Sequence, residues 1–471
     1  MTDLSRAAVR DAVGYFDSWL AFRQRYSRIP GVQAAVLHGD EILLSAAYGH
    51  ADVEAGVELT PRHLFRIASH SKTFTATAVL QLAEQGTLRL DDAARRWLPF
   101  LDGAPLSSVT VRELLGHSGG VVRDGHDGDF WQLYREFPDE ATLRKIATDG
   151  ADIIPPNERF KYSNIGYSLL GSIIAAASGQ DYNTYVRRHI VDRLSLADTG
   201  PEYDPARAGE YARGYTSLAY ADRRIPVDHV DTAAMSAATG FYSTAQDAVR
   251  YFSAHFHGDD RLLSDASKRL MQRAEWQVDG SDGEYGLGLD RAEIGGRRVF
   301  GHGGGYPGHI TKTYFDPEAK LAVSVLTNAI DGPAEPLASG LIRMVNLAVE
   351  SSGGNGDERR SDVDLDRFTG RFATMWGVQD VVRLGRRLYL FRPVADDPTQ
   401  PTTKLDVVDD STLRVVGGIG FGSYGETVRY EFSGAEVVSV RGGSATTAYP
   451  IERITAAVAT QERVSVGDPL R

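Results

Sequence analysis

The chain has 471 residues, and at roughly 150 residues per domain this length predicts more than one domain. Its composition, with 42% hydrophobic and 24% charged residues, is ordinary for a folded protein and excludes a wholly disordered or collagen-like chain. The formal net charge of −12 argues against a protein that mainly binds nucleic acid or an anionic membrane. Cysteine is absent, which excludes disulfides, thiolate metal ligands and a cysteine nucleophile.

The sequence contains no run of about 18 consecutive apolar residues, so we expect no membrane-spanning helix. Charged residues interrupt the apolar character of residues 1–20, which argues against a secretory signal peptide. We therefore expect a cytoplasmic protein.

Apolar residues spaced three and four apart predict amphipathic helices. The first such helix carries Val9, Val13, Phe16 and Leu20. Further helices are expected at residues 73–84, 164–178, 183–194 and about 333–350.

Runs of apolar and β-branched residues predict strands at residues 32–38, 41–49, 309–315 and 320–328. The first two are joined by a tight turn at Gly39-Asp40. With a long helical middle, this order suggests an antiparallel sheet whose edges come from both ends of the chain, with helices packed on it.

The composition changes after the last of these elements. Residues 351–362 contain no apolar residue and are rich in glycine and charge, so we expect a linker. Short β-rich runs separated by glycine and aspartate turns follow, which predicts a small all-β domain, either a barrel or a curved sheet. The expected domains are therefore residues 1–350 and residues 363–471, joined by the linker.

Ser69 and Lys72 form an S-x-x-K pattern at the start of the helix expected at 73–84. Residues three apart share one face of a helix, so we expect the hydroxyl and the amine to be neighbours. A lysine that is partly desolvated or close to other cations can be neutral and can take the proton of a serine. By itself the pattern is common, and a capped helix with a solvated lysine also produces it.

Three other motifs occur in unsuitable contexts. Residues 116–120, centred on Ser118, match the G-x-S-x-G nucleophile elbow, but a short helix precedes them and a loop follows, so we interpret them as a structural turn. Residues 303–308 and 420–425 match G-x-G-x-x-G, but strand-like sequence follows each, which argues against a dinucleotide site. His255 and His257 lack a third ligand, so we expect no metal.

Two further motifs follow the S-x-x-K pattern in a fixed order. Tyr162 and Asn164 form a Y-x-N pattern, and His302, Gly303 and Gly304 form an H-x-G pattern before a strand. The three motifs together resemble the serine β-lactamase-related superfamily, which includes class C β-lactamases, DD-peptidases, family VIII esterases and D-aminopeptidases. The resemblance covers about residues 20–350.

The resemblance implies an α+β fold, namely an α/β/α sandwich with a central antiparallel sheet plus an all-α region at about residues 90–240. It places the H-x-G motif near an inner strand of the sheet, facing Ser69. The C-terminal β-rich segment resembles the lipocalin-like domain that some peptidases and esterases of the family carry.

The resemblance also implies a mechanism. Ser69 would be the nucleophile that forms an acyl-enzyme, and Lys72 would be its base or an orienting cation. Tyr162, with a pKa lowered by nearby cations, would share the base role and return the proton to the leaving group. Asn164 would hydrogen-bond Lys72 and the acyl amide of the substrate. Which of Lys72 and Tyr162 is the base stays open.

The substrate is expected to bind along His302, Gly303, Gly304 and Gly305. The backbone N–H groups of the nucleophile and of Gly305 or Tyr306 would form the oxyanion hole. His302 stands where K-T-G relatives have lysine, and a neutral imidazole binds a carboxylate less well than a permanent ammonium. This favours the esterases and aminopeptidases over an efficient β-lactamase or carboxypeptidase.

The leading expectation is a serine hydrolase of peptides, amides or esters, with D-amino-acid peptides and small esters favoured. Acyl transfer or peptide cyclisation of the penicillin-binding-protein type, a β-lactamase, and a non-catalytic scaffold are the alternatives. We expect a small-molecule or peptide substrate as the partner, and no nucleic acid, membrane, cofactor or metal. The C-terminal domain is expected to complete the pocket, to dock a second subunit in a homo-oligomer, or both. Two histidines near the motifs, His117 and His309, are interpreted as structural.

Overall fold

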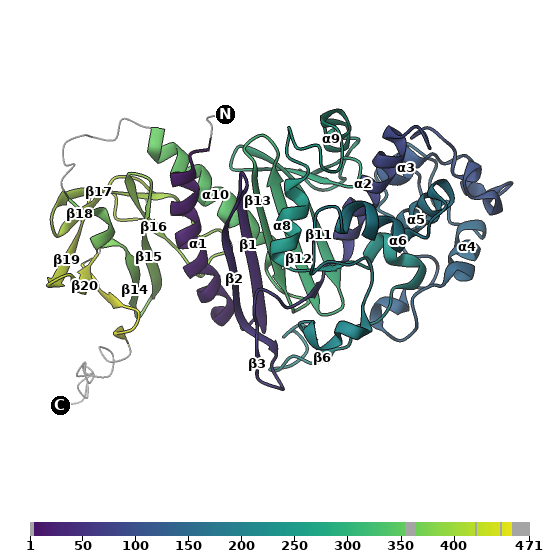
Figure 1. Cartoon of the computed structure of the whole chain (residues 1–471). Helices are drawn as coiled ribbons and strands as arrows, with labels where there is room; N and C mark the ends of the chain where they lie inside the picture. The colour runs from purple at the N-terminus through teal and green to yellow at the C-terminus, as the bar shows by residue number, and fades with distance from the viewer. Residues whose placement is uncertain (1–3, 354–362, 420–421, 443–444, 455–471) are drawn as a thin grey trace. The chain divides into compact units, whose positions relative to one another are not determined.

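The computed structural model describes residues 4–353, 363–419, 422–442 and 445–454 (Figure 1). Contacts divide the chain into two compact units. One unit, called the sheet unit, is Arg23–Ile342. The other, called the barrel unit, combines Met1–Phe22 with Arg343–Arg471.

Within the described residues, the sheet unit is built on a nine-stranded antiparallel sheet in the order β3-β2-β1-β13-β12-β11-β10-β9-β8. The strands are β1 (Gly31–His38), β2 (Glu41–Asp52), β3 (Val57–Glu58), β8 (Trp276–Gln277), β9 (Glu284–Tyr285), β10 (Asp290–Ile294), β11 (Arg297–Tyr306), β12 (His309–Asp316) and β13 (Leu321–Thr327). The four strands predicted from the sequence are confirmed as β1, β2, β12 and β13.

The first and the last of the predicted strands are neighbours inside the sheet. β1 pairs with β13, with Val36 opposite Val323, and every residue of β13 is buried. Apolar strands buried on both faces belong in the middle of a sheet, which explains their place. The expectation that both edges come from the chain ends is therefore wrong, since the short strand β8 forms the second edge.

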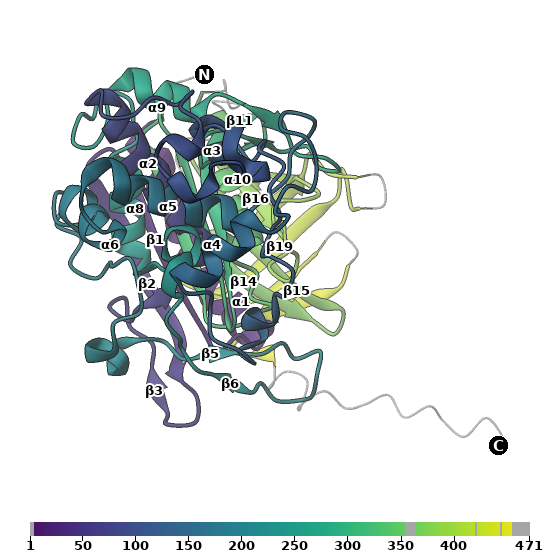
Figure 2. The same cartoon turned by 90° about the vertical axis from the view of Figure 1, so that its right-hand side faces the viewer.

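The sheet unit also contains α-helices. They are α2 (Ser71–Glu84), α3 (Val111–Leu115), α4 (Glu140–Thr148), α5 (Asn164–Ser178), α6 (Tyr182–Val186), α7 (Ser236–Thr239), α8 (Ala245–Ser253) and α9 (Asp265–Gln272). α8 lies against β1 and β13 (Figure 1), and Figure 2 looks onto α3–α6. Every residue of α2 from Ser71 to Leu82 is buried.

The predicted helices 73–84 and 164–178 are confirmed as α2 and α5. The helix predicted at 183–194 is shorter, because α6 ends at Val186 and a π-helical turn, Arg187–Val191, follows. The region predicted as all-α also holds one small pair of strands, β5 (Gly214–Tyr215) and β6 (Pro226–Val227).

The barrel unit contains a closed eight-stranded barrel in which each strand pairs with the next and β14 pairs with β21. The strands are β14 (Gly370–Thr374), β15 (Gly377–Leu384), β16 (Arg387–Phe391), β17 (Thr403–Asp409), β18 (Thr412–Val415), β19 (Thr427–Ser433), β20 (Glu436–Arg441) and β21 (Thr447–Pro450). Apolar side chains such as Phe368, Leu388 and Leu413 fill its core. The predicted all-β character of this segment is confirmed.

Two helices run into the barrel unit, α1 (Arg6–Tyr26) and α10 (Ala334–Gly353). α10 continues through the first three residues of the predicted linker 351–362, and residues 354–362 lie outside the described residues. Residues 1–22 and 343–353 belong to the barrel unit, whereas the boundary predicted from the sequence falls at residue 350.

α1 is tied to the barrel by polar contacts from one of its faces. The Tyr15 hydroxyl donates to Asp380 Oδ2 at 2.8 Å, and Trp19 Nε1 donates to the Pro393 carbonyl at 2.9 Å. Arg371 donates to both carboxylate oxygens of Asp380, at 2.8 and 2.7 Å. Burial and the neighbouring Asp380 raise the pKa of Tyr15. The buried Asp380 is thus the acceptor that Tyr15 and Arg371 share.

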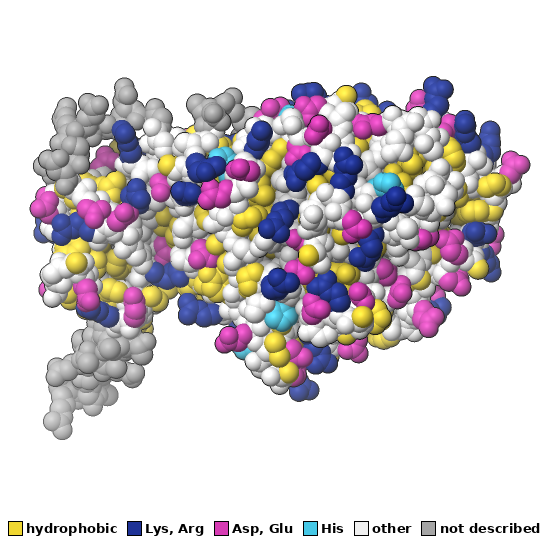
Figure 3. Space-filling model, viewed as in Figure 1, with side chains coloured by type: hydrophobic (Ala, Val, Ile, Leu, Met, Phe, Trp, Pro, Cys, Tyr) yellow, Lys and Arg dark blue, Asp and Glu magenta, His cyan; other side chains and the backbone are white. Residues whose placement is uncertain are grey.

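In the described part of the chain, every helix is too short or too polar to span a lipid bilayer. On the face drawn in Figure 3, acidic and basic side chains are interspersed, with no large patch of either sign.

Asp380→Ala is expected to destabilise the barrel unit by about 3–5 kcal/mol, because it leaves the Arg371 guanidinium, whose side chain is only 14% exposed, and the Tyr15 hydroxyl without this acceptor. The measurement is the free energy of unfolding in denaturant. Asp366→Ala is the control, since Asp366 pairs with Arg383 at an exposed position and its loss is worth at most about 1 kcal/mol. Equal effects of the two substitutions would contradict the role given to Asp380.

Candidate active site

Ser69 lies on a short 3₁₀ turn, Ala68–His70, that leads directly into α2. The turn follows β4 (Phe65–Arg66), which pairs with β7 (Tyr242–Ser243). Ala68 has a φ of +46°, a left-handed conformation that an alanine adopts only when its surroundings impose it. The Ser71 hydroxyl imposes it in part, since it donates to the Ala68 carbonyl at 2.5 Å and accepts the Phe241 N–H at 3.0 Å.

Lys72 lies one turn further along α2 and is completely buried. Its Nζ lies 3.2 Å from Ser69 Oγ and donates to Asn164 Oδ1 at 2.7 Å and to the Ala238 carbonyl at 2.9 Å. Burial lowers the pKa of Lys72 well below the ordinary value of 10.5. A neutral amine has two N–H donors and one lone pair. The two oxygen acceptors use both donors, so the lone pair can face the serine hydroxyl.

Tyr162 approaches Ser69 from the segment that precedes α5. Its hydroxyl donates to Ser69 Oγ at 2.9 Å, and its ring centroid lies 4.8 Å from Lys72 Nζ. The prediction that nearby cations lower the pKa of Tyr162 is wrong, because burial raises it well above the ordinary value of 10.0. Burial disfavours the charged form of both groups, so it favours a neutral Lys72 beside a protonated Tyr162.

Asn164, at the start of α5, is held by two groups. Its Oδ1 accepts from Lys72, and its Nδ2 donates to Asp124 Oδ1 at 2.7 Å. Asp124 also accepts from Trp131 Nε1 and from Arg123 Nε, each at 3.0 Å. The sequence analysis missed Asp124, because no motif marks it and only the fold brings it to Asn164. Each end of the Asn164 amide is engaged once, so Nδ2 still has a second N–H, and contact of Asn164 with a substrate amide stays a prediction.

The H-x-G motif lies on the inner strand β11 and is pressed against the turn of the serine. A Cβ atom at Gly304 would lie 2.1 Å from the Ile67 carbonyl oxygen, so only glycine permits this approach. Gly305 is exposed, and the open space beside it is lined by Ile310. β10 pairs with β11 only as far as Gly301 in the described structure. Among the described strands, none pairs with β11 on this side from His302 onward.

His302 itself is buried. Its Nε2 lies 3.1 Å from the Tyr285 hydroxyl, and its Nδ1 lies 2.6 Å from the Gly303 carbonyl. Burial lowers the pKa of His302 to about 4, so the ring is neutral near pH 7. Contact between His302 and a substrate stays a prediction.

An ion pair that the sequence analysis missed lies beside this strand. Lys312, on β12 opposite Gly303, donates to Asp290 Oδ2 at 2.8 Å. The Lys312 and His302 charges lower the pKa of Asp290 to about 2 although burial opposes this, and Asp290 raises the pKa of Lys312 although burial opposes this too. The cation next to the H-x-G strand is thus a lysine of the neighbouring strand, already paired with a carboxylate.

The other motifs are placed in structural roles. Ser118 is buried in a turn after α3, and residues 303–308 form the end of β11 and the turn into β12. Of residues 420–425, Gly420 and Phe421 lie outside the described residues. None of the groups of acidic, histidine or cysteine side chains in the described ranges could hold a metal ion.

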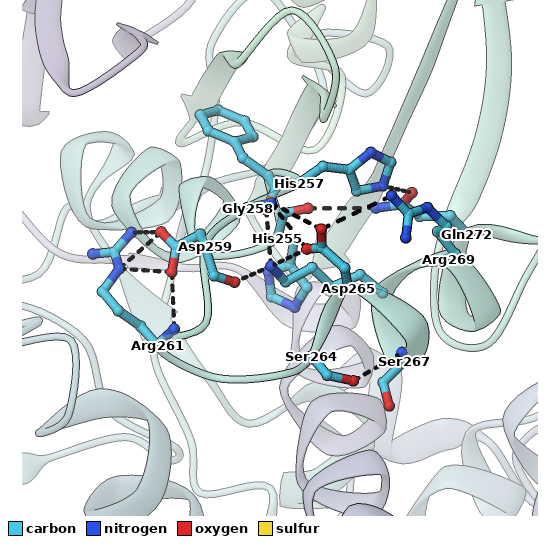
Figure 4. Close-up of polar contacts among 12 residues, drawn as sticks. His255, His257, Gly258, Asp259, Arg261, Ser264, Asp265, Ser267, Arg269 and Gln272 are labelled. Atoms are coloured by element: carbon cyan, nitrogen blue, oxygen red, sulfur yellow. Dashed lines mark hydrogen bonds and ion pairs between the residues drawn. The ribbon is translucent and has the colours of Figure 1, made fainter.

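His255 and His257 have different hydrogen-bond partners, and Figure 4 marks the contact between the His257 ring and Gln272. His255 is buried, with Nε2 3.0 Å from Thr77 Oγ1. His257 lies 3.0 Å from Gln272 Oε1 and 2.8 Å from Glu318 Oε1.

The structure therefore brings Ser69, Lys72, Tyr162 and Asn164 together, as the motifs predict, and sets the H-x-G strand against the serine turn. A half-buried hydroxyl beside a neutral amine and a protonated phenol can attack an electrophilic carbon and pass on its proton. This arrangement defines a candidate serine-nucleophile site.

Comparison with known proteins gives the class. The Beta-lactamase family model matches residues 16–345, and the chain belongs to this family.

Individual relatives add detail. Penicillin-binding protein 4* of Bacillus subtilis (strain 168) is 29% identical over 289 residues, which are 58% of this chain and 62% of that protein. The matched region thus spans less than two thirds of that relative. The structure of D-amino acid amidase from Ochrobactrum anthropi SV3 superposes with a TM-score of 0.61 at 27% identity, covering 73% of this chain and 100% of that one.

One further structure resembles both units. The octameric penicillin-binding protein homologue from Pyrococcus abyssi superposes with a TM-score of 0.65 over 91% of this chain and 98% of that one. At 22% identity this likeness supports the fold alone.

Gly304→Ala is expected to lower the thermal unfolding midpoint and to slow reaction at Ser69, because the new Cβ would displace β11 from the serine turn. Gly303→Ala is the control for stability, since a Cβ there would make only ordinary van der Waals contacts, with the Lys312 side chain and the Thr311 carbonyl oxygen, each at 3.6 Å. The measurement is thermal unfolding of both variants. A Gly304→Ala protein as stable as Gly303→Ala would contradict the close approach.

The rate of Ser69 acylation by a p-nitrophenyl ester is expected to rise with pH and to level off below the ordinary lysine value of 10.5. The rate rises with pH because the lone pair that accepts the serine proton exists only on the neutral amine. This neutral form appears as the pH rises through the lowered pKa of Lys72. Lys72→Arg, protonated at all working pH values, is expected to lose at least ~100-fold. A midpoint at or above the ordinary value would contradict a neutral Lys72.

Proposed function

We propose that the protein is a serine hydrolase that works through an acyl-enzyme on Ser69. The observation that carries the proposal is the Ser69 hydroxyl, which has both the Lys72 amine and the Tyr162 phenol within hydrogen-bond distance. In the first step Ser69 Oγ bonds to the substrate carbonyl carbon while its proton moves to Lys72 Nζ. The carbonyl oxygen becomes an oxyanion, which the backbone N–H groups of Ser69 and Gly305 would stabilise.

Collapse of this intermediate breaks the bond to the leaving amine or alcohol. The proton held by Lys72 reaches the leaving group by way of the Tyr162 hydroxyl. Water then attacks the acyl carbon while the same groups take its proton. The bond between this carbon and Ser69 Oγ breaks, the carboxylic acid is released, and Ser69 Oγ takes the proton back. The raised pKa of Tyr162 keeps its hydroxyl protonated, so that it has a proton to pass on, and the lowered pKa of Lys72 supports its role as the base.

D-amino-acid amides and peptides and small esters are the proposed substrates. The similarity to D-amino acid amidase supports this class. His302 is neutral and buried, and Lys312 on the neighbouring strand is already paired with Asp290, so neither side chain is a free cation for a leaving-group carboxylate, which argues against a carboxypeptidase or an efficient β-lactamase. The complete set of contacts around Ser69 argues against a non-catalytic scaffold.

The predicted role of the C-terminal barrel is to determine the range of substrates or to make the contacts of a homo-oligomer. We propose that water, rather than an amine, accepts the acyl group from Ser69. Acyl transfer to an amine, including cyclisation, is the alternative outcome of the same acyl-enzyme.

The proposal is tested by incubating the wild type and Ser69→Ala with D- and L-phenylalanine amide, p-nitrophenyl esters and nitrocefin, with release of amine or alcohol as the readout. We expect turnover of the D-amide or the esters by the wild type alone. Preferred hydrolysis of nitrocefin would overturn the substrate assignment, and turnover by Ser69→Ala would overturn the mechanism.

Tyr162→Phe is expected to reduce turnover at least ~100-fold, because it removes the hydroxyl that carries the proton to the leaving group. The loss is expected to be larger for an amide than for a p-nitrophenyl ester, whose leaving group needs no proton. Steady-state kinetics with the two substrates provide the measurement. Turnover near the wild-type value with the amide would remove Tyr162 from the mechanism.

A further inference from the structure

The loop at residues 116–120, which resembles a nucleophile elbow in sequence, has a different task in the structure. It follows α3 and runs beside residues 153–163, the segment that leads to Tyr162. Its carbonyl groups accept hydrogen bonds from that segment: Gly120 from the Ile153 N–H at 2.9 Å, and Ser118 from the Asn157 N–H at 2.8 Å. A Cβ at Gly120 would lie 1.9 Å from the Ile154 oxygen, so the contact requires glycine.

His117 makes the contacts closest to Tyr162. Its carbonyl accepts the Lys161 N–H at 2.8 Å, and its Nδ1 accepts the Ser163 N–H at 3.1 Å. The residues on both sides of Tyr162 are therefore fixed by one histidine. The imidazole also packs on the Tyr162 ring, with 4.3 Å between ring centroids.

The state of His117 suits this task. The residue is buried and has a φ of +58°, a conformation that histidine rarely adopts and that turns its side chain toward Ser163. Because Nδ1 accepts a hydrogen bond, it carries no proton in this geometry. Burial lowers the pKa of His117 well below its ordinary value, which keeps the ring neutral and Nδ1 available.

We propose that His117 is a positioning residue that holds Tyr162 against Ser69 by accepting backbone hydrogen bonds from both of its neighbours. The expectation that His117 is merely structural is thereby replaced by a specific role. The inference rests on the proposed function of Tyr162 as the proton carrier. A displacement of about 1 Å at a proton-transfer group can lower the rate of reaction about 100-fold.

Two variants separate the acceptor from the rest of the side chain. Asparagine and glycine both tolerate the positive φ of residue 117, and both lack the imidazole ring. Only His117→Asn keeps a side-chain acceptor, Oδ1, that can reach the Ser163 N–H. The control is His255→Asn, which alters another fully buried histidine of the sheet unit, one that contacts Thr77 rather than the Tyr162 segment.

The experiment measures the labelling of Ser69 by a fluorophosphonate, separated into the rate constant at saturation and the concentration for half-saturation, together with thermal unfolding. We expect His117→Gly to lower the saturating rate at least 10-fold with little change in half-saturation, and His117→Asn to recover most of that loss. His255→Asn shows what lost stability alone does to labelling. Equal losses in the Asn and Gly variants, or losses that follow the unfolding midpoint across all three, would overturn the inference.

Amide hydrogen exchange of the peptide that contains residues 161–164 tests the hydrogen bonds of this segment to His117 without any reaction. Faster exchange in His117→Gly than in His117→Asn is the expected result, and equal exchange in the two would overturn the inference. If the wild type is not labelled at Ser69, the proposed function fails, whereas the exchange result still decides whether His117 holds this segment.

Discussion

The structure of the site depends on one constraint, the burial of an amine. Lys72 is completely enclosed on α2, and removing an ammonium from water is costly enough that the neutral form becomes competitive. The surroundings are suited to that form, because they offer two oxygen acceptors, one on Asn164 and one on Ala238. A third acceptor with a full charge in direct contact would instead have fixed the ammonium. Burial lowers the pKa of Lys72 more than the charges of Asp124 and Asp290, neither of which is hydrogen-bonded to its amine, raise it.

Three pieces of the fold converge to maintain this enclosure. The 3₁₀ turn and α2 supply Ser69 and Lys72, the end of the segment before α5 and the first residue of α5 supply Tyr162 and Asn164, and β11 closes the other side. Each needs an uncommon backbone feature at its point of contact, namely the positive φ of Ala68, the positive φ of His117 and the bare Cα of Gly304. The strain of the two positive φ values persists only where the surrounding structure imposes it.

The sequence predicts the reacting groups well, because chemistry restricts them to few residue types at fixed spacing. Ser69 and Lys72 are one helical turn apart, and the Y-x-N and H-x-G motifs follow in order, so the structure brings together residues that the motifs had already named. The sheet strands β1, β2, β12 and β13 were predictable for a related reason, since continuous apolar runs mark buried strands.

What the sequence does not reveal depends on distant contacts. Asp124 and the Lys312–Asp290 pair carry no local signal, because each partner comes from a different element. The pKa of Tyr162 was predicted in the wrong direction, since neighbouring cations can be guessed from a motif but the extent of burial cannot. The helix predicted at 183–194 was too long because the apolar periodicity continues through the π-helical turn after α6.

The most direct test of this account is peptide mapping by mass spectrometry after treatment with a fluorophosphonate probe. The account predicts a single adduct on Ser69 that is absent from Ser69→Ala. An adduct on Ser118 would instead support the nucleophile-elbow interpretation of residues 116–120, and the absence of any serine adduct would contradict an activated Ser69.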